Sequence, residues 1–106
     1  MPKYLIRTTY TPEGTKGLLA EGGSARRAAV ERVVASCGGT LEAMYFAYGD
    51  TDLYSIVDFP DQVSMAAVAM TVRASGAVQS SATPLLSVEE IDEAAEKSID
   101  FRPPGG

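Results

Sequence analysis

The chain has 106 residues, enough for one small domain, and its formal charge is −5, from nine basic and fourteen acidic residues. This negative balance argues against binding to nucleic acid, while 45% apolar and 22% charged residues are typical of a folded domain. There is no histidine, and Cys37 is the single cysteine. Histidine bases, histidine-ligated metals and intrachain disulfides are therefore excluded, and we expect neither a metal nor another cofactor.

No segment reaches the ~20 apolar residues of a membrane span, and the first residues lack the apolar core of a signal peptide, so we expect no membrane contact and a cytoplasmic location.

The first quarter of the chain predicts a strand and a short helix. Residues 3–10 (KYLIRTTY) mix aromatic and β-branched side chains that alternate between two faces, as in a strand. Thr11 and Pro12 suit the cap and the first position of a helix, and Gly22 and Gly23 end it.

A second helical piece is predicted over residues 25–36, with Ser24 as its cap and Gly38 after its end. Its apolar stripe has helical spacing and consists of Val30, Val33, Val34 and Cys37. Arg26 and the other charged residues of this piece lie largely off the stripe, so we expect them in solvent.

The middle of the chain predicts a β-hairpin. Residues 40–48 (TLEAMYFAY) and 52–59 (DLYSIVDF) read as strands, and the segment 49–51 between them suits a turn. Strict alternation along the first of these strands places Leu41 and Tyr45 on one face and Phe46 on the other, so that both faces are apolar.

The remainder predicts a helix, a weaker strand and an acidic helix. Residues 63–74 have an apolar stripe at helical spacing, and residues 77–86 form a strand in which Pro84 suits an edge or terminal position. The sequence SVEE at residues 87–90 is a capping box that opens a final helix to about Lys97.

This order of elements, β-α-β-β-α-β with one further helix, is that of an α+β ferredoxin-like domain, in which an antiparallel sheet carries helices on one face. We expect a single domain over residues 1–98 and a tail over residues 99–106. Because the second strand is apolar on both faces, the uncovered face of the sheet is expected to be an interface. The economical solution is a symmetric dimer whose sheets pack face to face, so the main expected partner is a second copy of the chain.

The stretch AVERVVASCGGTLEAMYFAYGDTDLYSIVDFPD, residues 29–61, resembles the GYD-domain family of small bacterial proteins. The shared features are the glycine pair before the second strand, the aromatic strand around Tyr45, the hairpin turn and the Pro-Asp pair that follows. The resemblance covers roughly residues 3–97 and implies a ferredoxin-like domain assembled as a dimeric α/β barrel, without specifying a reaction. Two positions depart from the family pattern, because Thr51 replaces a turn tyrosine and Asp58 replaces a glutamate.

Without histidine, any acid–base chemistry falls to carboxylates and phenols, with arginine as an electrostatic partner. Asp52, Asp58 and Tyr54, all in the predicted third strand, are the candidate catalytic residues. The alternative for Asp52 is a structural role, because aspartates in turns bond nearby backbone amides and favour the hairpin.

Arg7, Tyr45 and Tyr48 are the candidate ligand-binding residues, since a guanidinium can bind a carboxylate and strand-borne aromatic rings can line an apolar pocket. Two structural alternatives stay open. The tyrosines can fill a dimer interface, and Arg7 can form an ion pair with Asp58 on the neighbouring third strand.

Three functions follow from these alternatives. The leading hypothesis is a homo-oligomer that binds a small apolar or aromatic molecule between sheet and helices. The alternative is a cofactor-independent enzyme of the dimeric α/β-barrel kind, such as a monooxygenase, isomerase or cyclase. The third is an interaction role through the acidic C-terminal helix. A pocket containing a carboxylate of raised pKa favours the enzyme, a pocket without one favours binding, and no pocket favours the interaction role.

Overall fold

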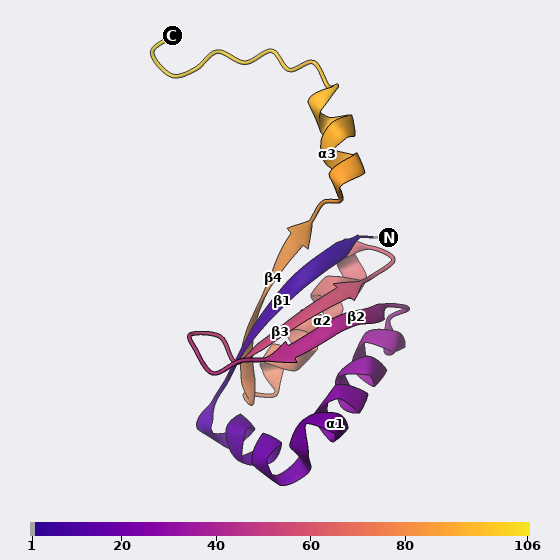
Figure 1. The fold of residues 1–106 in the computed structure, drawn as a ribbon, viewed down its shortest axis with the longest axis vertical. Helices are drawn as coiled ribbons and strands as arrows, with labels where there is room; N and C mark the ends of the chain where they lie inside the picture. The colour runs from indigo at the N-terminus through magenta and orange to yellow at the C-terminus, as the bar shows by residue number, and fades with distance from the viewer. Residues whose placement is uncertain (1) are drawn as a thin grey trace.

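The computed structural model describes residues 2–106 and shows a four-stranded sheet with three helices (Figure 1). The elements in chain order are β1 (Lys3–Tyr10), α1 (Pro12–Ser36), β2 (Thr40–Phe46), β3 (Leu53–Asp58), α2 (Gln62–Ala74), β4 (Val78–Leu85) and α3 (Val88–Ala95). The strand order is β2-β3-β1-β4 and every pairing is antiparallel. The α+β, ferredoxin-like fold expected from the sequence is thereby confirmed.

The helical segment after β1 bends at the glycines that were expected to separate two pieces. Gly22 has φ 82° and ψ 171° inside α1, a conformation that side chains with a Cβ rarely adopt, and helix resumes directly after it. Thr11 caps the first piece, because its side chain accepts a hydrogen bond from the Gly14 N–H at 3.2 Å. The predicted break is therefore correct, although the two pieces follow each other without an intervening loop.

The hairpin differs from the prediction in its strand bounds and in its pairing. β2 ends at Phe46 and β3 begins at Leu53, so Tyr48 and Asp52 lie outside the strands.

A β-bulge interrupts the pairing of β2 with β3 between Leu41 and Ala43, so that one extra residue is accommodated there. Leu41 pairs with Val57 and packs against the core, whereas Tyr45 pairs with Tyr54 on the other side of the sheet. The expectation that Leu41 and Tyr45 share a face is therefore wrong, because the bulge shifts the alternation by one residue.

The hydrophobic core lies on one face of the sheet, between the sheet and both helices α1 and α2. Phe59 and Val57 are the most deeply buried large side chains, with 0% and 1% of their surface exposed. Around them pack buried residues of β1 and both helices: Tyr4, Val34, Met65 and Val68. No helix of the described part of the chain covers the other face of the sheet (Figure 1), and we call it the open face.

Helix α3 and the tail project away from this body, as the upper part of Figure 1 shows. The chain measures 56 × 33 × 22 Å, and its radius of gyration of 17.0 Å exceeds the value of about 13 Å expected for a compact chain of this length. The capping box is formed as predicted, since Ser87 and Glu90 exchange side-chain and backbone hydrogen bonds. Every residue of α3 is exposed, so its apolar side chains lie largely in solvent.

The first turn of α1 gives a test of this packing. A Cβ at Gly14 would collide with the carbonyl oxygen of Ala77, which already accepts hydrogen bonds from the Thr11 N–H and hydroxyl at 3.0 Å each. We expect Gly14→Ala to lower the unfolding free energy by about 1–3 kcal/mol in urea titrations. A Cβ at Gly17 meets nothing within 4 Å, so Gly17→Ala should raise the same quantity by about 0.5–1 kcal/mol. Equal stability of the two variants would contradict the close approach of α1 to Ala77.

Candidate functional site

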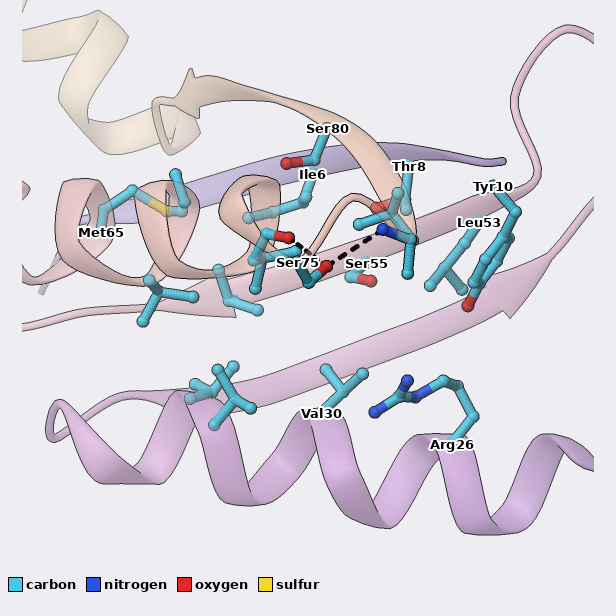
Figure 2. A pocket seen from close by; sticks show the side chains of 18 of the residues that line it. Ile6, Thr8, Tyr10, Arg26, Val30, Leu53, Ser55, Met65, Ser75 and Ser80 are labelled. Carbon is cyan, nitrogen blue, oxygen red and sulfur yellow. Dashed lines mark hydrogen bonds between the residues drawn. The ribbon is translucent and has the colours of Figure 1, made fainter. Parts of the chain in front are cut away.

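A cleft runs between the inner face of the sheet and the two helices that cover it (Figure 2). Helix α1 packs against β2 and β1, and α2 packs against β4, so the inner face of β1 and β3 is the floor between them. The cleft has a volume of about 270 Å³. Side chains from all four of α1, α2, β1 and β3 line it, together with residues at the start of β4.

Most of this lining is apolar. The helices contribute Val30, Val33, Met65, Ala69 and Val72, and the strands contribute aliphatic side chains from the alternate positions that face inward. Hydroxyl groups lie on the floor at Thr8 and Ser55, two residues that are themselves buried. The cleft thus combines an apolar wall with a few polar groups, the composition usual for small-molecule sites.

Among residues 2–106, Arg26 is the only cation in the lining, and it reaches from α1 toward the sheet at one end of the cleft (Figure 2). About one third of its side chain is exposed, and its Nε is buried without a hydrogen-bond partner. Glu21 Oε1 lies 3.9 Å from this Nε, beyond hydrogen-bonding distance. The structure thus corrects the expectation that Arg26 lies free in solvent.

Tyr10 lies at the same end of the cleft, at the end of β1 (Figure 2). Burial raises the pKa of the Tyr10 phenol, and the carboxylates of Glu21 and Asp52 act in the same direction, whereas Arg26 opposes them. The backbone N–H of Tyr10 donates to Asp52 Oδ2 at 2.8 Å, which fixes the end of the strand. At neutral pH the phenol is therefore protonated and able to donate a hydrogen bond.

Four of the residues singled out from the sequence lie on the open face. Arg7 stands opposite Tyr54 in the pairing of β1 with β3, and Tyr54 stands opposite Tyr45 in β2. Asp58 pairs with Lys3, whose Nζ lies 3.2 Å from Oδ1 of Asp58 and also contacts Glu42. The expected ion pair between Arg7 and Asp58 is wrong, because the register places Lys3 opposite Asp58 and leaves Arg7 bonded to Thr83 Oγ1 at 3.4 Å.

The other two lie near the hairpin loop. Asp52 is half-buried and uses its carboxylate to accept from Tyr10, as a structural turn residue would. Tyr48 is fully exposed in the loop after β2. None of the six candidates, Arg7, Tyr45, Tyr48, Asp52, Tyr54 and Asp58, lines the cleft. Their catalytic and ligand-binding roles stay predictions.

The candidate site residues chosen from the sequence do not include Arg26 and Tyr10. A signal for Arg26 was present, because residues 26, 30, 33 and 34 have the spacing of one helix face, and Arg26 continues the valine stripe by one turn. For Tyr10, alternation from the buried Tyr4 and Thr8 would have placed it on the inner face.

Neither a membrane-crossing helix nor a metal-binding cluster is found among residues 2–106. No helix in that range is long and apolar enough to cross a membrane. No group of three or more cysteine, aspartate or glutamate side chains is arranged there to hold a metal ion.

The fold and the cleft define a class of small α+β proteins with a ferredoxin-like sheet and a hollow between sheet and helices. Comparison with family models gives a match to the GYD domain over residues 4–95. The chain belongs to the GYD-domain family, as the resemblance of the hairpin region indicated. Comparisons with curated proteins and with solved structures gave no match.

The raised pKa of Tyr10 gives a test of the geometry at this end of the cleft. Because the neutral phenol is favoured in the folded state, its contribution to stability is intact below the ordinary tyrosine pKa near 10 and is lost as pH rises through the higher folded value. In a titration of the tyrosine ring ¹³Cζ resonances, Tyr10 should titrate at a higher pH in the folded protein than in the urea-unfolded chain. Tyr10→Phe should remove that late resonance and so assign it. A Tyr10 curve that coincides in the folded and unfolded protein would contradict burial of the phenol.

Proposed function

We propose that this GYD-domain protein binds a small organic molecule in the cleft between the sheet and helices α1 and α2. The observation that carries the proposal is the cleft itself, which has a mainly apolar lining and a polar end within an otherwise packed domain. Its volume of about 270 Å³ is slightly below the range found for most ligand pockets, about 300–1,000 Å³. The expected ligand is therefore small and largely apolar or aromatic.

The character of the lining favours binding over catalysis. Among residues 2–106, no aspartate, glutamate, lysine or cysteine side chain lines the cleft, and its titratable groups are Tyr10 and Arg26. A cofactor-independent monooxygenase, isomerase or cyclase needs a group that accepts a proton near the reacting atom. The candidate bases Asp52 and Asp58 are engaged elsewhere, with a backbone N–H and with Lys3. These contacts support a binding function, and the enzyme remains the alternative.

The proposal includes assembly of two copies through their open faces. At the centre of this face, Ile56 of β3 stands opposite Leu5 of β1 and Ala43 of β2, and the half-exposed Tyr54 and more exposed Tyr45 adjoin them. An apolar and aromatic surface over three neighbouring strands is typical of a protein interface. A symmetric dimer would bury it against the same surface of the second copy.

Helix α3 adds support for assembly. Isolated helices shorter than about 12–15 residues are marginal in water, and α3 has eight residues, none of them buried. Ile91, Ile99 and Phe101 are exposed along α3 and the tail that follows it. Contact with a second copy would bury these side chains and stabilise the helix. A cytoplasmic location, expected from the sequence, is part of the same proposal.

Ligand binding is tested by thermal-shift screening with a library of small apolar and aromatic compounds. Binding to the folded state alone raises the Tm as the ligand concentration exceeds the dissociation constant. Ala69→Phe should fill the cleft and abolish the shift, because Ala69 lines it. Ala66→Phe is the matched control on the exposed side of α2 and should keep the shift. The proposal fails if no compound raises the Tm, or if Ala69→Phe responds like the unaltered protein.

Assembly is tested by sedimentation velocity at micromolar concentration, where we expect a dimer. Ile56→Asp should give monomers, because the interface would then have to bury unpaired carboxylates. Tyr45→Asp should weaken the dimer as well, and because 73% of Tyr45 is exposed, this change leaves the core of the chain untouched. Val63→Asp, at an exposed position on α2, is the control and should remain dimeric. A monomeric unaltered protein would refute assembly through the open face.

A further inference from the structure

Arg26 is a charged residue in a cleft whose lining is mainly apolar. Among residues 2–106, its Nε is the single buried side-chain nitrogen or oxygen atom without a hydrogen-bond partner. Such a donor costs free energy, and the cost is larger when the group is charged. The neighbouring carboxylate of Glu21, 3.9 Å away, is too distant to accept from it. At the edge of the cleft, Arg26 therefore forms a loose ion pair with Glu21 and keeps an Nε–H donor that no acceptor satisfies.

The surroundings of Arg26 specify what kind of acceptor fits. From Arg26 the cleft continues along α1 past Val30 (Figure 2). Val33 of α1 and Val72 of α2 also line it. Tyr10, across from Arg26, adds a protonated phenol, a second donor. Hydrogen-bond donors and positive charge thus gather at one end of the cleft, and aliphatic side chains form the rest.

We propose that the ligand is a small amphipathic carboxylate, whose anionic oxygens bind the guanidinium of Arg26 while its hydrocarbon or aromatic body fills the apolar part of the cleft. This inference rests on the proposed function, because it names the chemical class of the molecule bound there. A guanidinium binds a carboxylate through two parallel N–H···O bonds, which makes the pair both stronger and more directional than a neutral hydrogen bond. Tyr10 is positioned to donate to the same carboxylate.

The test compares two acids with their alcohols, octanoate with 1-octanol and phenylacetate with 2-phenylethanol. Each pair has the same apolar body and differs in the charged head group. Affinities are measured by isothermal titration calorimetry at fixed ionic strength, with the Arg26 ¹⁵Nε resonance followed by NMR. We expect the acids to bind at least about tenfold more tightly than the alcohols, and Arg26→Gln to remove that difference while changing alcohol binding less than about twofold.

Arg27→Gln is the matched control, because Arg27 is the next residue of α1, is more than half exposed and does not line the cleft. It should leave both affinities unchanged, and only the acids should shift the Arg26 ¹⁵Nε resonance. If acids and alcohols bind equally and Arg26→Gln affects neither, the carboxylate inference is overturned while ligand binding stands. If Arg27→Gln weakens the acids as much as Arg26→Gln, the attraction comes from general surface charge, and the inference is likewise overturned. If none of the four probes binds at millimolar concentration, the inference is overturned, and the library screen then decides the binding function separately.

Discussion

The pairing register of β1 with β3 determines the rest of the structure. Tyr4 stands opposite Val57 and Arg7 opposite Tyr54, and because side chains alternate along a strand, this register sends one set inward and the other to the open face. With β3 in place, a shift of β1 by one residue would move Arg7 into the core and expose Tyr4. The inner set holds α1 and α2 on the sheet, and the outer set forms the surface proposed to meet a second copy. Both proposed activities therefore depend on the same two central strands.

The order of the elements could be predicted because each carries a local signal. Thr11 and Ser87 cap helices where the sequence places them, and Gly22 bends α1 where two glycines were expected to interrupt it. The bulge at β2 could not be predicted, since nothing in the segment TLEAMYF shows that one extra residue will be accommodated there. Without it, strict alternation wrongly groups Leu41 with Tyr45.

The candidate site was harder to predict than the fold, because it depends on distances between elements. Arg7 and Asp58 lie on neighbouring strands as expected, yet their pairing depends on a register that sequence does not specify, and Lys3 takes the place opposite Asp58. The cleft depends on the separation between α1 and α2. This separation is determined by where the two helices pack on the twisted sheet. The charge of Arg26 led to the prediction that it lies in solvent, which is wrong for its head group. A long side chain can begin on an exposed part of a helix and still place its charged group at the edge of the core.

The distribution of charge sets a physical limit on the proposed ligand. The chain carries a net charge of −5, so an anionic molecule is repelled at long range, although salt screens this field over about 10 Å at ordinary ionic strength. In the lining of the cleft the balance reverses, because among residues 2–106 Arg26 is the only charged side chain there, although the carboxylates of Glu21 and Asp52 lie near that end. Glu21 is a close competitor, and its 3.9 Å separation from Arg26 Nε leaves this atom without a hydrogen bond to it. The preference for an anion would therefore come from the short-range contact at Arg26. The remaining affinity would come from burial of the apolar body of the ligand in the valine-lined part of the cleft.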